Sequence, residues 1–147
     1  MSVRPWPGGV AAITLFVDDL QTAKTFYTRA FGLPVHHEDE ESVVLAFGGT
    51  LVNLLNRAAA PELIAPAAVA GREGGSRFVL TVRVHDVDEV CAELRAAGVE
   101  LLNGPVDRPW GVRTASFRDP DGHIWEIAWN PGWYLSAEGD TRLQKPA

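Results

Sequence analysis

The chain has 147 residues, of which 46% are hydrophobic and 22% are charged, as expected for one globular domain. Its net charge of −6 argues against general binding to nucleic acid or to an anionic membrane, because both require a basic surface. The single cysteine, Cys91, excludes an internal disulfide, and no apolar run is long enough to span a bilayer. Residues 1–9 also lack the layout of a signal peptide, so we expect a cytoplasmic protein.

The first structural unit is predicted over residues 10–56. Alternation over 10–17 predicts a strand with Ile13 on one face and Thr14 on the other. Asp18 or Asp19 can cap the helix that follows, and Gly32 ends that helix. Further strands are predicted near residues 35–40, 42–47 and 51–56, the last two joined at Gly48-Gly49.

A linker rich in alanine, proline and glycine is predicted over 57–77, with room for a short helical piece. The second unit, 78–130, repeats the pattern of the first. Its helix begins at Asp86, and the strands are expected near 78–84, 100–103, 113–118 and 123–129. The segment Asp119-Pro120-Asp121-Gly122 has strong turn chemistry. A polar tail, 131–147, is expected to be loosely held.

The two units have the same βαβββ order, so the sequence can be aligned to itself. In this alignment Ala12 corresponds to Val79, and Asn53 corresponds to Glu126. Neither unit can bury a sheet face alone. We therefore predict an α+β fold in which tandem βαβββ modules form a curved mixed sheet with a concave cleft and helices on the convex side.

The sequence Val17-Asp18-Asp19-Leu20 and the motif from Asp119 to Glu126 (D-P-D-G-x-x-x-E) carry a family resemblance. Together with the duplication, they resemble the vicinal oxygen chelate superfamily over about residues 10–130. That superfamily includes glyoxalase I, extradiol dioxygenases and fosfomycin- and bleomycin-resistance proteins. The resemblance implies the fold and a homodimer. It implies an activity only weakly, because one fold carries many functions.

Enzymes of this family hold a divalent metal with side chains from the first and last strand of each unit. Carried over by motif, these positions are Ala12, Asn53, Val79 and Glu126. Only Glu126 is a good ligand, and a catalytic metal site usually needs about three. We therefore expect no metal and no other cofactor. A divalent metal is possible only with a non-standard ligand set, in which His36 or His37 is the first candidate to help.

The residues expected to bind a ligand in the cleft are Phe16, Asn53, Arg83, Trp110, Arg113 and Glu126. Glu126 is also the candidate catalytic residue, as a general base. The alternative is a structural ion pair of Glu126 with Arg83 or Arg113. Trp110 can stack on a planar ligand or can simply anchor its own loop. His123 has the opposite parity to Glu126 and is expected to be a solvated surface residue.

The first functional hypothesis is a glyoxalase- or bleomycin-resistance-like protein that binds a small, partly aromatic, antibiotic-type molecule without a metal. The alternative is a metal-dependent lyase or dioxygenase of the same superfamily, using Glu126 with a non-standard ligand set. A third possibility is a regulatory domain with a vestigial cleft. In each case no nucleic acid and no membrane is expected as a partner.

Overall fold

The computed structural model describes residues 8–135 and 141–143, and it contains the predicted duplication. The first module comprises β1 (Ala12–Val17), α1 (Leu20–Phe31), β2 (Val35–Glu38), β3 (Ser42–Phe47) and β4 (Thr50–Asn56). The second comprises β5 (Leu80–Arg83), α3 (Val87–Ala96), β6 (Leu101–Asp107), β7 (Arg113–Arg118) and β8 (Ile124–Trp129). The segment between the modules holds the short helix α2 (Pro61–Ile64), flanked by the 3₁₀ turns η1 (Arg57–Ala59) and η2 (Arg72–Gly74).

Each module forms one four-stranded mixed sheet, and the two sheets have equivalent strand orders. The order is β1-β4-β3-β2 in the first and β5-β8-β7-β6 in the second. In each sheet the first and last strands of the module are parallel, and the other pairs are antiparallel. This register places Thr14 beside Asn53 in one sheet and Thr81 beside Glu126 in the other. The predicted α+β class with tandem βαβββ modules is confirmed, and the strands form two mixed sheets rather than one continuous curved sheet.

The two main helices begin at the predicted aspartates. The side chain of Asp19 accepts a hydrogen bond from the backbone N–H of Thr22 at 2.8 Å, and that of Asp86 accepts one from Glu89 at 3.0 Å. Each bond satisfies a helix N–H that has no partner inside its helix. Gly32 ends α1 with a φ of 63°, a left-handed conformation that glycine adopts without strain. The caps therefore fix where each helix leaves its sheet.

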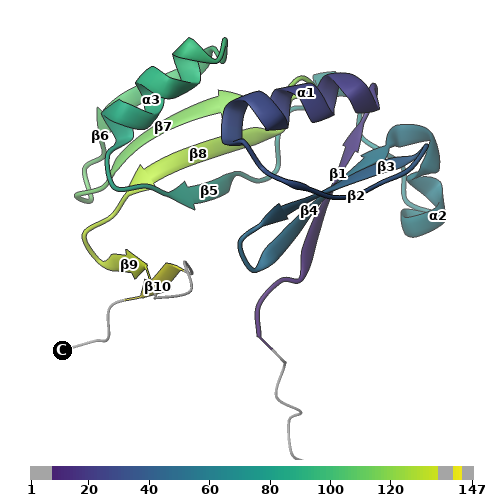
Figure 1. Ribbon diagram of the computed structural model, residues 1–147, viewed down its shortest axis with the longest axis horizontal. Coiled ribbons are helices and arrows are strands. Elements are labelled where there is room, and N and C mark those ends of the chain that lie inside the picture. The colour runs from purple at the N-terminus through teal and green to yellow at the C-terminus, as the bar shows by residue number, and fades with distance from the viewer. Residues whose placement is uncertain (1–7, 136–140, 144–147) are drawn as a thin grey trace, which may run out of the picture.

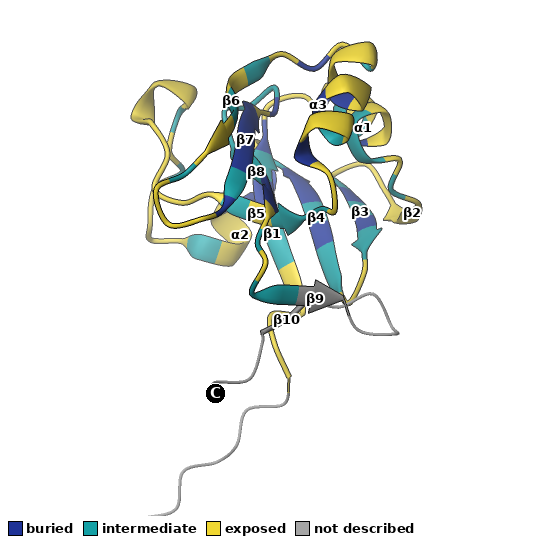
Figure 2. Cartoon of the chain, turned by 90° about the vertical axis from the view of Figure 1, so that its left-hand side faces the viewer, coloured by how far each residue is buried: buried dark blue, intermediate teal, exposed yellow. Residues whose placement is uncertain are grey.

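Side-chain packing, rather than strand pairing, joins the two modules. Figure 1 shows α1 and α3 on the same side of the two sheets. The ring of Trp125 on β8 lies 5.9 Å from that of Tyr27 and 5.0 Å from that of Phe31, both on α1, and stacks on Phe47 of β3 at 5.8 Å. Figure 2 shows buried residues along strands of both sheets, and residues of both modules belong to one core cluster. Within one chain the sheets thus stay two hydrogen-bonded units with a common core.

Of the tail 131–147 that was predicted to be loosely held, the structure describes residues 131–135 and 141–143, and the rest lies outside the described residues. Strands β9 (Trp133–Leu135) and β10 (Thr141–Leu143) pair antiparallel, and Arg83 donates to the carbonyl of Trp133 at 3.3 Å. The aromatic and β-branched residues in these segments favour strands, which a reading of the tail as merely polar overlooked. Among the described residues, no helix is both long and apolar enough to cross a bilayer.

Candidate functional site

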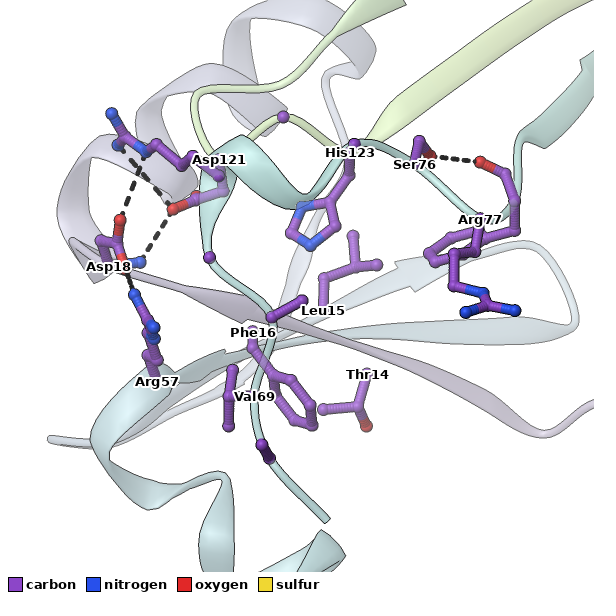
Figure 3. A pocket seen from close by; sticks show the side chains of 17 residues that line it. Thr14, Leu15, Phe16, Asp18, Arg57, Val69, Ser76, Arg77, Asp121 and His123 are labelled. Atoms are coloured by element: carbon purple, nitrogen blue, oxygen red, sulfur yellow. Dashed lines mark hydrogen bonds and ion pairs between the residues drawn. The ribbon is translucent and has the colours of Figure 1, made fainter.

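A cavity of about 370 Å³ lies where the two modules and the linker meet (Figure 3). Strand β1 supplies Thr14 and Phe16, the linker supplies Val69 and Arg77, and the turn before β8 supplies His123. Phe16 points away from the shared core because it alternates with the buried Leu15 and Val17 along β1. The cavity therefore has an aromatic wall beside several polar groups, as small-molecule sites usually do.

The imidazole of His123 is held in place by a buried carboxylate. Its Nδ1 lies 2.7 Å from Oδ2 of Asp119, a residue that is only 5% exposed. The hydroxyl of Tyr27 donates to the same oxygen at 2.6 Å, and Nε1 of Trp125 donates to that hydroxyl at 2.9 Å. The other carboxylate oxygen accepts the backbone N–H groups of Asp121 and His123, both at 2.9 Å. This network fixes the ring at the edge of the cavity.

The same network raises the pKa of two of its members. Burial acts to lower the pKa of His123, but the hydrogen bond and charge of Asp119, with the charge of Asp121, outweigh it, and the pKa is raised. Burial and then the neighbouring Asp119 raise the pKa of Tyr27, so this phenol stays a donor. His123 therefore binds a proton more readily than an ordinary histidine does.

A second group of charges lies at another edge of the cavity. Asp18 pairs with Arg57 at 3.5 Å and with Arg72 at 3.3 Å. The backbone N–H of Asp18 donates to Oδ1 of Asp121 at 2.8 Å, which ties β1 to the β7–β8 turn (Figure 3). Burial is the main cause of a raised pKa at Asp121. These contacts close one end of the cavity across both modules.

The four positions that the family resemblance assigns to a metal do not offer a metal site. At two of them Nδ2 of Asn53 donates to Thr14 at 3.4 Å, and Oε1 of Glu126 accepts from Thr81 at 3.0 Å. Ala12 and Val79, the other two, have no donor atom. Within residues 8–135 and 141–143, no group of three or more histidine, cysteine, aspartate or glutamate residues is placed to hold a metal. His37 instead lies 3.2 Å from Asp39 in an exposed part of the chain. These residues do not fit a divalent metal.

The six predicted ligand-binding residues do not gather in one place. Phe16 lines the cavity, and Asn53 contacts its neighbour Thr14, with an Oδ1 atom that is buried and has no partner among the described residues. Glu126 contacts Thr81 in the other sheet. Trp110 is 72% exposed in its loop and does not line the cavity.

The two arginines considered as partners of Glu126 make other contacts. Arg113 has the opposite parity to Glu126 on the paired strands, and it binds Asp88 at 2.9 Å and Asp107 at 3.0 Å. Arg83 donates to the carbonyl of Trp133, while its Nε and Nη1 are buried without a partner in the described part of the chain. An ion pair of Glu126 with either arginine is thus not formed, because strand parity and the C-terminal hairpin direct both elsewhere.

His123 is the residue that sequence reasoning placed wrongly. It was expected to be a solvated surface residue, but its side chain is only 19% exposed and it lines the cavity. An aspartate four residues before a histidine across a tight turn was the available signal. The contribution of the linker to the cavity had no such signal, because it depends on how the linker folds back over β1.

Comparisons with known proteins agree on the fold. YraH of Bacillus subtilis (strain 168) is 36% identical over 120 residues, which cover 78% of this chain and 93% of that protein. The virulence protein STM3117 of Salmonella typhimurium is 25% identical over 119 residues, or 79% of this chain and 80% of that one. The crystal structure of a glyoxalase-related enzyme from Fulvimarina pelagi matches with a TM-score of 0.81 at 29% identity, covering 93% of this chain and 99% of that one. A family model matches residues 9–127, so the chain belongs to the Glyoxalase/Bleomycin resistance protein/Dioxygenase superfamily.

Proposed function

We propose that this protein binds a small, partly aromatic molecule in the cavity beside Phe16, without a catalytic divalent metal. The observation that carries the proposal is the cavity itself: its volume of about 370 Å³ falls in the range of small-molecule sites, and both modules wall it. Phe16 and Val69 offer an apolar surface, and Thr14 and His123 offer hydrogen-bonding groups. Antibiotic-type molecules that combine a ring with polar groups suit this lining.

The residues at the family's metal positions support a metal-free site. An alanine and a valine stand where two of the ligands would be, and the amide of Asn53 is a weak ligand for transition metals. Glu126 already accepts a hydrogen bond from Thr81. The residues at these four positions are consistent with a protein that binds a molecule without activating it at a metal.

We also propose that two copies form a homodimer. Exposed apolar side chains precede the corresponding strands β1 and β5: Val10 is 65% exposed and Val79 is 48% exposed. Covering them would remove apolar surface from water, which is the main driving force for association. Analytical ultracentrifugation should give twice the chain mass, and Val79→Asp should shift the equilibrium toward the monomer. A wild-type protein that stays monomeric at high concentration would refute this part.

The binding proposal is tested by tryptophan fluorescence with a panel of aromatic antibiotics, together with metal analysis of the purified protein. We expect saturable quenching by at least one compound, unchanged after treatment with a chelator. Phe16→Ala should weaken that binding, whereas Trp110→Ala, an exposed aromatic outside the cavity, should not. No binding across the panel, or binding that requires a stoichiometric metal, would overturn the proposal.

A further inference from the structure

The cavity carries an excess of positive charge although the chain as a whole is acidic. Three arginines line it, Arg57, Arg72 and Arg77, against two aspartates, Asp18 and Asp121. The formal net charge of the protein is −6. A local positive surplus inside an acidic protein concentrates anions at that place, because a cleft focuses the field of the charges that line it.

The surplus charge is on Arg77. Arg57 and Arg72 both pair with Asp18, and Arg72 also lies 4.0 Å from Asp121. Arg77 makes no ion pair with any residue that the structure describes, and its side chain is exposed at the rim (Figure 3). Its guanidinium can therefore bind an incoming anion without first breaking a salt bridge.

His123 supplies a second donor beside the same space. A carboxylate only accepts hydrogen bonds, so the Nδ1 of His123 that faces Asp119 must carry a proton. The Nε2 atom makes no hydrogen bond within the described part of the chain and is not among its buried unpaired atoms. In the protonated ring Nε2 is a donor as well, and Asp119 stabilises that form.

We infer that the cavity takes the carboxylate of a small aromatic acid, which Arg77 and the imidazolium of His123 hold while its ring packs against Phe16. This inference rests on the proposed function and specifies the charge of the molecule that is bound. A bidentate contact from arginine and a charged donor from histidine are the interactions that proteins use for carboxylates. The apolar side chains of Phe16 and Val69 require a hydrophobic body, which a free inorganic anion lacks.

The charges around His123 set the expected pH dependence. Asp119 and Asp121 come from its own turn, Tyr27 from α1, Arg72 and Arg77 from the linker, and Asp18 from the end of β1. Asp119 contacts the ring directly, and Arg57 and Arg72 offset Asp18 and Asp121. Because neutral His123 offers only a lone pair at Nε2, binding of a carboxylate should weaken as the pH rises through the pKa of His123.

The test is isothermal titration calorimetry of the full chain at millimolar concentrations of benzoate, of indole-3-acetate, of the neutral isostere benzamide and of inorganic phosphate. We expect at least one aromatic acid to bind more tightly than benzamide and phosphate. Arg77→Gln should weaken the binding of that acid about tenfold through the loss of the charged contact, and Arg77→Lys, which keeps the charge but cannot form the bidentate contact, should recover only part of that affinity. Arg95→Gln removes an exposed arginine from α3, outside the cavity, and should change nothing.

Other results would overturn the inference. If benzamide binds as tightly as benzoate, and Arg77→Gln does not change its affinity, the cavity takes a neutral ligand. That result would overturn this inference but leave the proposed function standing. Phosphate that matches both acids would show that the aromatic body is not recognised. If neither acid binds to the folded wild-type protein, the inference is also refuted.

The variant His123→Asn tests the second donor, and its fold is checked by circular dichroism. We expect it to bind the acid more weakly, with an affinity that no longer depends on pH between 5 and 8. An unchanged pH profile would exclude His123 as the donor.

Discussion

The two central hairpins occupy corresponding places in the duplication, yet their turns differ. In the first module β3 and β4 are paired up to Phe47 and Thr50, with only Gly48 and Gly49 between them. In the second module the pairing of β7 and β8 stops at Arg118 and Ile124, and residues 119–123 form a longer turn. The short turn ends its own sheet, whereas the long one reaches into the other module.

This difference explains why the chain has a cavity at one end of the duplication. The longer turn carries Asp119, which binds Tyr27 of the first module, and His123, which lines the cavity. The short glycine turn has no side chain that can do either. The second unit thus supplies a wall of the cavity through its longer turn, while Thr14–Asn53 and Thr81–Glu126 are paired in the same way in the two sheets.

Removing the carboxylate of the long turn should have the largest effect. Asp119→Ala leaves the hydroxyl of Tyr27 and two backbone N–H groups without an acceptor in a buried place, and it should lower the free energy of unfolding by about 4 kcal/mol. Urea unfolding of the wild type and the variant measures this loss of unfolding free energy. Asp39→Ala is the matched control, because Asp39 accepts similar backbone bonds in an exposed turn, and its effect should be much smaller. Equal losses would contradict the difference between the turns.

The edge of the second sheet gives the next largest effect. Gly104 has a φ of 87°, and a Cβ there would lie 2.6 Å from the carbonyl oxygen of Thr114 on β7. Gly104→Ala adds overpacking to backbone strain and should cost about 3 kcal/mol. Gly98→Ala has a similar φ of 86° with open space around it, so it should cost only about 1 kcal/mol. Thermal unfolding of both variants checks the difference, and equal shifts would contradict it.

A smaller effect is expected where the two modules meet. Tyr27→Phe removes the hydroxyl that joins Trp125 to Asp119, and should cost about 1.5 kcal/mol. If the hydroxyl acts through Asp119, the effects of Tyr27→Phe and Asp119→Ala will not add in a double-mutant cycle. Additive effects would mean that the turn and the first module are not coupled through this bond.

The smallest effect is a pH dependence of stability from His123. Its pKa is raised in the folded protein, so its contribution is fully present below the unfolded pKa of about 6.5 and is lost as the pH rises through the folded value. As the pH rises through the folded pKa, the difference in unfolding free energy between wild type and His123→Asn should therefore shrink. A difference that stays constant across this range would show that the imidazolium does not stabilise the turn.

The architecture could be predicted from the sequence because local patterns determine it. Alternation along β1 assigned Thr14 and Phe16 to one face, and the asparagine-glutamate correspondence of the repeat matches the observed register beside Thr14 and Thr81. The cavity could be predicted only in part. Phe16 was identified, but the place of His123 depends on a buried carboxylate, and the other wall depends on the path of the linker. Such long-range arrangements leave little trace in local periodicity.

The most direct test of the account is to map a bound aromatic acid on the amide spectrum of the protein by nuclear magnetic resonance. With benzoate or indole-3-acetate, the account predicts chemical-shift changes at residues 14–16, in the linker at 68–78 and in the turn at 121–123. Changes confined to the outer face of β5 and β8, around Thr81 and Glu126, would contradict it.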